Sequence, residues 1–311
     1  MGDITLFRVV GDTVEQLTGS SIAVEKSLQD VIEKHLDAFL GVRLLAHEYA
    51  TGKTHGGRID TLGIDENGSA VIIEYKRALN QNVINQGLYY LDWLLDHRAE
   101  FKLLVLDQLG VEHANIIDWG RPRLLCIASD FTKFDAHAVA QINRSIELIR
   151  YRRYGDDLLL LELVNAPIEQ VAEDDARAPA GPPSKGSNKG ETIYKSVTES
   201  FNQATVAQRD RFEALKAFLL ALGDDVQMKT LKLYIAFRRI KNFACVEVRT
   251  QTENLVVYVK VNPTSIALEP GFTRDVRTIG HFGTGELEIT IKNDADLERA
   301  KPLLLTSYGA S

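Results

Sequence analysis

The chain has 311 residues, of which 45% are hydrophobic and 25% charged, and its formal net charge is −7. This composition is typical of a globular protein with a real core, and the length favours two domains. The negative net charge excludes a surface that is basic throughout. It does not exclude a local basic groove, because the distribution of charge decides nucleic-acid binding.

Targeting signals, apolar runs and cysteines indicate the cellular compartment. No basic stretch followed by an apolar core opens it, and no apolar run approaches the roughly 18 residues of a membrane helix. We therefore expect neither a signal peptide nor a membrane partner. Cys126 and Cys245 lie in separate apolar stretches that predict buried strands. Buried, reduced thiols fit a cytoplasmic protein.

The first predicted elements are a hairpin with strands at 4–9 and 13–17, and a helix over 22–39. One stripe of this helix is mostly apolar but includes Glu25 and Gln29. A carboxylate is rarely buried without a partner. Glu25 therefore either stabilises the first turn through the helix dipole or points at a functional site, and the sequence leaves both readings open.

A strand at 44–49 and a second hairpin follow, and the second hairpin is the central prediction. A two-residue turn at Asn67-Gly68 would pair Asp60 with Tyr75, whereas a three-residue loop with Gly68 in the left-handed conformation pairs Asp60 with Glu74. We predict the three-residue loop, because it brings Asp60, Glu74 and Lys76 onto one face. Two adjacent carboxylates repel each other, and a divalent cation such as Mg²⁺ or Mn²⁺ is the simplest remedy.

A helix over 82–98 comes next, with Gln86 and Tyr90 four residues apart on one face. We then expect strands at 101–106 and 123–128, a helix over 136–144, and a hairpin with strands at 145–154 and 157–164. This last hairpin carries Arg150, Arg152 and Arg153. The cluster is either a solvated strand face or a contact to the DNA backbone.

Residues 166–190 are predicted to be a flexible linker, since they are rich in proline, glycine and serine. The second domain, 191–311, is expected to contain helices at 193–202, 207–222 and 294–307 and strands at 231–239, 243–249, 255–261 and 287–291. Its glycine-rich stretch 280–285 is not followed by Gly-Lys-Ser/Thr, which favours a tight strand connection over a phosphate-binding loop. A basic side is predicted from Lys229, Lys232, Arg238, Arg239 and Lys241.

An aspartate, a spacer and then Glu-x-Lys on a hairpin, here Asp60, Glu74 and Lys76, resembles the PD-(D/E)xK nuclease superfamily. Gln86-x-x-x-Tyr90 on the following helix is similar to the motif of its RecB-like branch. The resemblance covers roughly residues 20 to 130. It implies an α/β fold, with a restriction-endonuclease-like mixed sheet flanked by helices in residues 1–165. One departure is an isoleucine at 59, where the name-giving proline would stand.

The second domain resembles an uncharacterised α+β domain often attached to nuclease-like N-terminal halves. The residues that carry this likeness are Tyr234-x-x-Phe237, Asn242-Phe243, the stretch 276–286 and Ser307-Tyr308. That family implies no agreed activity, so binding of nucleic acid or of a partner protein is the expectation for this domain.

The resemblance implies Mg²⁺- or Mn²⁺-dependent hydrolysis of DNA phosphodiester bonds, in repair or defence. Asp60 and Glu74, with Glu25 as a further ligand, would hold the metal, and Lys76 would hold or deprotonate the attacking water. Gln86 and Tyr90 would orient the reacting groups. Substrate contacts are expected from the following arginines: Arg58, Arg77, Arg150, Arg152 and Arg153. A homodimer is a candidate assembly. The alternative is a catalytically inactive scaffold that binds nucleic acid or protein, since a fold does not settle activity.

Overall fold

The computed structural model describes residues 4–21, 25–52, 56–76, 83–165 and 196–311. The chain divides into two compact units, Met1–Pro167 and Ile168–Ser311. The linker predicted at 166–190 lies outside the described residues, and so does Arg77. Glu25 begins a described helix, but its side chain also lies outside what is described.

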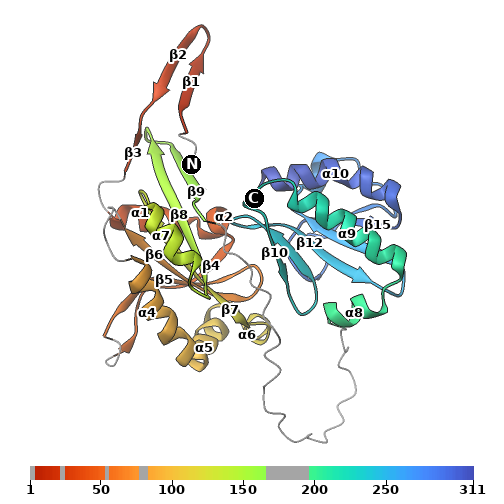
Figure 1. The fold of residues 1–311 in the computed structure, drawn as a ribbon, viewed down its shortest axis with the longest axis horizontal. Coiled ribbons are helices and arrows are strands. Elements are labelled where there is room, and N and C mark those ends of the chain that lie inside the picture. Colours follow the sequence, from red (N-terminus) through yellow and green to blue (C-terminus); the bar gives the residue numbers. More distant parts are fainter. Residues whose placement is uncertain (1–3, 22–24, 53–55, 77–82, 166–195) are drawn as a thin grey trace, which may run out of the picture. The chain divides into compact units, whose positions relative to one another are not determined.

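The first unit is built on a mixed sheet (Figure 1). Its described helices and strands are, in chain order, β1 (Leu6–Val10), β2 (Thr13–Leu17), β3 (Gly19–Ser20), α1 (Glu25–Lys34), α2 (Leu36–Leu40), β4 (Val42–Ala50), β5 (Arg58–Asp65), β6 (Ser69–Lys76), α4 (Val83–Asp96), α5 (Arg98–Leu109), α6 (Val111–Asn115), β7 (Asp118–Ala128), α7 (Lys133–Ala140), β8 (Ser145–Tyr154) and β9 (Leu158–Leu163).

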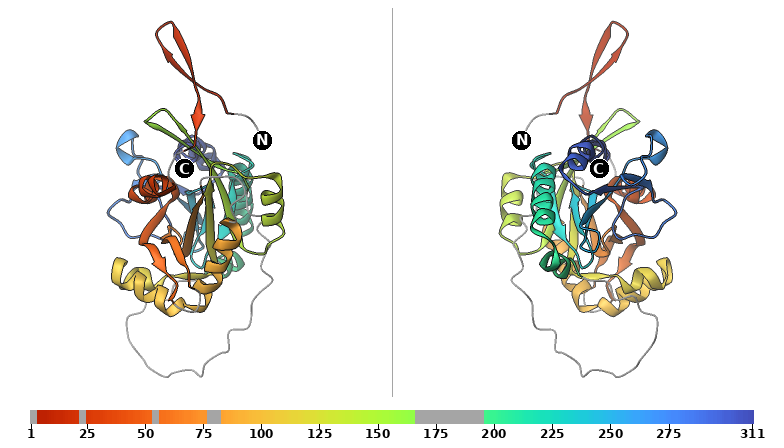
Figure 2. Two further views of the ribbon diagram at one scale, coloured as in Figure 1. Left: turned by 90° about the vertical axis from the view of Figure 1, so that its left-hand side faces the viewer. Right: turned by 90° about the vertical axis from the view of Figure 1, so that its right-hand side faces the viewer.

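The described strands of this sheet follow the order β3-β8-β7-β6-β5-β4, and β9 also pairs with β8. β4, β5 and β6 are antiparallel, whereas β6, β7 and β8 run parallel. Helices α1 and α7 lie on opposite sides of the sheet (Figure 2). A single hydrophobic cluster joins α4, α5 and α7 to alternate residues of β5, β6 and β7, among them Leu62, Ile72 and Leu124. The predicted α/β fold with a mixed sheet flanked by helices is confirmed.

The second unit places an antiparallel sheet against helices. Its described elements are α8 (Val197–Gln203), α9 (Val206–Leu220), β10 (Gln227–Thr230), β11 (Ile235–Arg238), β12 (Asn242–Arg249), β13 (Asn254–Val259), the 3-10 helix η1 (Pro263–Ser265), β14 (Thr273–Asp275), β15 (Leu287–Ile291) and α10 (Asp294–Gly309). The described strand order is β10-β11-β12-β13-β15-β14. Asn293 caps α10 by accepting a hydrogen bond from Asp296 N.

The register of the central hairpin is confirmed. Thr61 pairs with Ile73 and Ile64 with Ala70, and this register continues to Asp60 opposite Glu74. The loop between β5 and β6 has three residues, and Gly68 adopts φ +79°. A Cβ at this position would approach Ile116 O to 2.6 Å, so both the backbone angle and the space favour glycine.

Several predicted elements are wrong in kind or extent. Residues 101–106, predicted as a strand, belong to helix α5, because only Phe101 and Val105 of this apolar run are buried and they lie four residues apart. The first helix is broken at His35, which leaves the helical conformation (φ −131°, ψ 33°), into α1 and α2. The helix predicted at 136–144 begins at Lys133, since Thr132 forms a capping box with Asp135.

In the second unit the strand predicted at 231–239 is shorter, since β11 spans Ile235–Arg238, and the strand before it, β10, was not predicted. β10 ends at residue 230, and residues 231–234 connect it to β11 through a turn in which Leu231 N donates to Tyr234 O (2.9 Å). The predicted basic side is also corrected. Lys229 and Arg238 are buried, and Arg239 pairs with Asp225 at 2.7 Å. Arg238 donates to Ile240 O (2.8 Å), so both arginines are engaged within the unit, whereas Lys232 is exposed.

Candidate functional site

The end of the hairpin opposite its turn brings two carboxylates together. Asp60 is half-buried on β5, and Glu74 is fully buried on β6. The two strands exchange side-chain contacts here, since Asp60 N donates to Glu74 Oε1 (3.2 Å) and Tyr75 N donates to Asp60 Oδ2 (3.0 Å). Each carboxylate is thus held by the backbone of the other strand, which fixes both where the β5–β6 ladder ends.

Glu74 carries the strongest electrostatic signal in this pair. Its Oε2 atom is buried and has no hydrogen-bond partner. Burial, followed by the neighbouring Asp60 charge, raises the pKa of Glu74 to about 9, against smaller opposing effects of the Asp60 backbone N–H and of Lys76. A buried oxygen without a donor costs free energy unless a proton or a cation meets it.

The donor set fits a hard divalent cation. Asp60 and Glu74 supply carboxylate oxygens on adjacent strands, and the unpartnered Glu74 oxygen offers a coordination position. Within the described ranges no group of three or more His, Cys, Asp or Glu side chains could hold a metal ion. Mg²⁺ commonly keeps several water ligands and needs only one or two protein carboxylates, so two are enough.

Lys76 is the last residue of β6 and is half-buried. Its charge acts on Glu74, two residues earlier on the same face, by lowering the pKa of that carboxyl group. Tyr75, between them, points to the opposite face, where its hydroxyl lies 3.3 Å from Thr61 Oγ1. The alternation predicted for this strand therefore holds.

Helix α4 contributes Tyr90 to the entry of β5. The Tyr90 side chain is buried, and its hydroxyl accepts a hydrogen bond from Arg58 N (3.1 Å). Gly57 packs so closely that an added Cβ would lie 2.5 Å from Tyr90 Cε1. Tyr90 thus holds the strand that carries Asp60. Gln86 is half-buried one turn earlier on the same helix.

Two residues of α1 that were not proposed as site residues also hold this strand. Gln29 is buried, and its Nε2 lies 2.9 Å from both Asp60 O and Glu33 Oε1. Thr61 Oγ1 donates to the same Glu33 oxygen (2.5 Å). A glutamine on a mostly apolar helical stripe was the available signal, because a buried amide needs polar partners. Glu33 left no such signal.

The predicted substrate-binding arginines are largely engaged within the protein. Arg58 pairs with Glu48 at 2.7 Å. Arg150 is buried and pairs with Glu162 (2.6 Å) and Asp130 (3.2 Å). Arg153 donates to the backbone of the β8–β9 turn at Gly155 and Asp156, and Arg152 is half-buried. The expectation of a solvated arginine cluster is therefore wrong for Arg150, whose charge is compensated by acids from outside its own strand.

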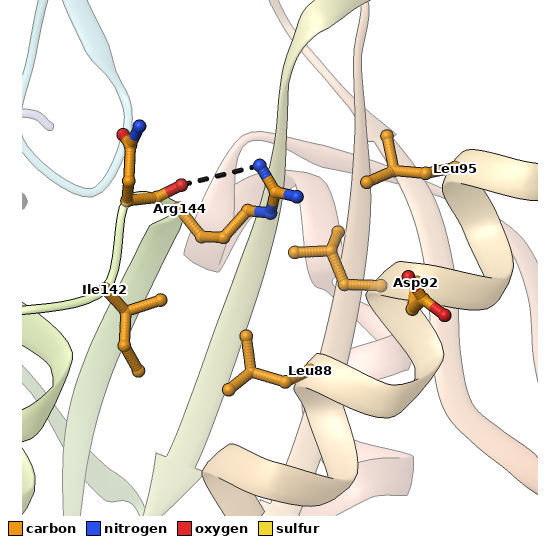
Figure 3. Close-up of a pocket in the computed structure, with 7 residues that line it drawn as sticks. Leu88, Asp92, Leu95, Ile142 and Arg144 are labelled. Atoms are coloured by element: carbon orange, nitrogen blue, oxygen red, sulfur yellow. Dashed lines mark hydrogen bonds between the residues drawn. The ribbon is translucent and has the colours of Figure 1, made fainter.

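A cavity of about 440 Å³ lies beside α4 (Figure 3). Its lining consists of Leu88, Leu91, Asp92, Leu95, Ile142, Asn143 and Arg144. None of these is a predicted site residue, so the cavity is distinct from the carboxylate pair. Both cysteines are buried and neither forms a disulfide, as predicted. No described helix has the length and apolar character needed to cross a bilayer.

Comparison with known proteins relates the first unit to nucleases. Residues 24–115 match the family described as the Endonuclease NucS C-terminal domain, and residues 197–311 match a domain of unknown function (DUF5655). An uncharacterised protein of Haemophilus influenzae is 28% identical over 297 residues, which cover 94% of this chain and 95% of that protein. The nuclease match includes Asp60, Glu74, Lys76, Gln86 and Tyr90.

Two solved structures have weaker similarity. A repair endonuclease from Pyrococcus abyssi is 16% identical with a TM-score of 0.28, over 44% of this chain and 51% of that one. The EndoMS–dsDNA complex is 16% identical with a TM-score of 0.24, over 42% and 47% of the two chains. The chain thus spans about half the length of these structures.

Proposed function

We propose that the first unit is a metal-dependent nuclease that hydrolyses phosphodiester bonds in DNA. The observation that carries this proposal is the buried, unpartnered Glu74 oxygen beside Asp60, inside the segment similar to an endonuclease domain. The Gln86-x-x-x-Tyr90 spacing on α4 supports the narrower assignment to the RecB-like branch of the PD-(D/E)xK superfamily.

Asp60 and Glu74 would hold Mg²⁺ or Mn²⁺, with Glu25 as the candidate third acid. When bound, such an ion polarises a phosphate oxygen and lowers the pKa of a water molecule towards neutrality. The Asp60 and Glu74 side chains are positioned in advance by the backbone N–H groups of Tyr75 and Asp60. This preorganisation avoids an entropic cost at the moment of reaction.

Lys76 would act on the nucleophile, and its position on the Glu74 face as the half-buried last residue of β6 supports this role. It would hold or deprotonate the attacking water and offset negative charge that develops on the phosphate. General-base assistance of this kind is worth on the order of 10²–10⁴ in rate. Tyr90 keeps Asp60 in place through the Arg58 backbone, and Gln86 would orient the substrate.

The test is cleavage of labelled single-stranded, double-stranded and branched DNA, and of matched RNA, with Mn²⁺ or Mg²⁺. We expect the wild type to cleave DNA, and Asp60→Asn and Glu74→Gln to lose cleavage while remaining folded. Asp107→Asn, at an exposed position on α5, is the matched control and should cleave normally. Cleavage by Asp60→Asn at the wild-type rate would refute the assignment.

The same assay separates the nuclease from the scaffold alternative. A scaffold would cleave none of these nucleic acids with either metal, and its DNA affinity would be unchanged by Asp60→Ala. A nuclease that lacks only its correct substrate would still bind Mn²⁺ through Asp60, so metal binding decides between these outcomes.

A further inference from the structure

Several apolar side chains of the β1–β2 hairpin are exposed. None of its ten strand residues is buried. Phe7, Val9 and Val14 share one face, since Val9 pairs with Val14 and Phe7 with Gln16, and they are 55%, 66% and 65% exposed. Among the described strands, β1 and β2 pair only with each other (Figure 1). An isolated two-stranded hairpin is marginally stable in water. Packing of its apolar face against another surface would therefore stabilise this hairpin.

The edge strand β9 also has apolar side chains that are not fully buried, and it has an outer edge without a neighbouring strand among those described. Its sequence is Leu-Leu-Leu-Leu-Glu-Leu, yet none of its six residues is buried. Within the part of the chain that the structure describes, β9 pairs with β8 alone, which leaves its outer edge without a strand. Exposed apolar edge strands are templates for association with another chain.

The apolar face of the β1–β2 hairpin and that of β9 have the same two-residue spacing of side chains, and both are uncharged. Leu159, Leu161 and Leu163 lie on one face of β9, spaced two residues apart, as Phe7 and Val9 are on β1. Neither row contains a charged residue, so their contact would bury no ion. The charged pair Arg8–Glu15 lies on the opposite face of the β1–β2 hairpin, and Glu162 lies on the opposite face of β9, where it pairs with Arg150.

We propose that a second copy of this chain covers both surfaces by reciprocal exchange. The Phe7–Val9–Val14 face of each copy packs on the Leu159–Leu161–Leu163 row of the other. Two such contacts related by a two-fold axis close the assembly, and the exposed hairpin face and the partly buried β9 row of each copy are then both occupied. β3, which follows the hairpin in the chain, pairs with β8, the strand that also pairs with β9, so both surfaces adjoin the same end of one sheet. The hairpin itself carries Arg8, Asp12 and Glu15, a balance that disfavours nucleic acid as the occupant.

The test is the mass of the full-length protein in solution, measured by sedimentation velocity and by light scattering at micromolar concentration. The wild type is expected to be a dimer. Val9→Asp and Leu161→Asp are each expected to be monomers, with dissociation constants weakened by about 100-fold or more, because each buries a carboxylate in both contacts. Val10→Asp is the matched control, since Val10 is equally exposed but lies on the opposite face of the hairpin.

Mixing the two variants distinguishes reciprocal exchange from other dimers. In a Val9→Asp/Leu161→Asp heterodimer, the intact hairpin of one copy meets the intact β9 of the other, so one of the two contacts survives. An equimolar mixture of Val9→Asp and Leu161→Asp should therefore form dimers. The double variant Val9→Asp/Leu161→Asp should form no heterodimer with the wild type, because each contact would then carry one aspartate. Restoration also demonstrates that both variants are folded. A Leu159→Asp variant repeats the test if Leu161→Asp lowers the melting temperature.

A monomeric wild type would overturn the proposal and leave another protein or residues 166–195 as the occupant. A dimer that persists in Val9→Asp would exclude the hairpin, and one that persists in Leu161→Asp would indicate contact between two hairpins. Because mass is the readout, these outcomes are independent of nuclease activity.

Discussion

Buried charged side chains are paired at one end of the β5–β6 hairpin and incompletely paired at the other. At the turn end, Arg123 lies between Asp65 (3.0 Å) and Glu147 (2.7 Å), and all three side chains are buried. At the open end, Glu74 is buried beside another carboxylate and keeps one oxygen without a partner. The first cluster is complete within the protein. The second lacks a partner for that oxygen, which is why we propose that a proton or a cation completes it.

Removal of Arg123 should have the largest effect on stability. Burial works to lower the pKa of Arg123, but the charges of Glu147 and Asp65 outweigh it and hold the pKa above its usual value. Arg123→Met would leave two buried carboxylates uncompensated, and we expect a loss of about 3–5 kcal/mol in the free energy of unfolding. Urea unfolding measures it. Lys102→Met on the exposed side of α5 should change little, and a loss below about 1 kcal/mol in Arg123→Met would contradict the contrast between the two ends.

Glu74→Gln should increase the free energy of unfolding, opposite to Arg123→Met, and the increase should grow with pH. The folded pKa of Glu74, about 9, lies above its ordinary value of 4.5, so the folded state holds one more proton than the unfolded state between these values. In wild type without metal this contribution to stability is present below pH 4.5 and is lost as the pH rises towards 9. Glutamine removes the dependence.

We therefore expect Glu74→Gln to gain stability over wild type by about 1 kcal/mol per pH unit from pH 5 to pH 8, close to the limit for one proton. Thermal unfolding in chelator at several pH values measures the difference. A pH-independent difference would show that Glu74 is ionised in the folded protein.

Gln29→Ala should cost about 2 kcal/mol, because it removes a donor from the half-buried Glu33 carboxylate and from Asp60 O. Asp30→Ala, the exposed neighbour on α1, is the control. Urea unfolding of the two variants gives the comparison. Equal stabilities would mean that α1 does not hold the Asp60 strand.

Tyr90→Phe should have the smallest effect, a loss of about 1 kcal/mol for the hydrogen bond that Arg58 N donates to its hydroxyl. The exposed neighbour Tyr89 provides the matched variant, Tyr89→Phe, which should be neutral. If Tyr90 acts only by holding β5, cleavage should fall much less than in Asp60→Asn. A complete loss of cleavage would instead indicate that its hydroxyl contacts the substrate.

The sequence predicted the open end of the hairpin better than the turn end, for a physical reason. Asp60, Glu74 and Lys76 are placed by local rules, namely strand alternation and the turn chemistry of Gly68. Arg123 meets acids 58 and 24 residues away, Asp65 and Glu147, and such pairings depend on strand order, which local patterns do not contain.

The same distinction explains the errors. Arg150 looked like part of a basic surface because Asp130 and Glu162 come from other elements of the fold. The run Phe101-Lys102-Leu103-Leu104-Val105-Leu106 is apolar enough for a strand, and only its burial pattern identifies a helix with Leu103 and Leu106 exposed. The helical spacing placed Gln29 on the mostly apolar stripe, but it did not identify the partners of Gln29, Glu33 Oε1 and Asp60 O.

The most direct test of the contrast is calorimetry with Mn²⁺ at pH 7 on the full-length protein. Wild type and Asp107→Asn should each bind one ion per chain through the Asp60–Glu74 pair, and Asp60→Ala should bind none while keeping its fold. Absence of binding in the wild type, or equal binding in Asp60→Ala, would contradict the claim that a cation completes the open end of the hairpin.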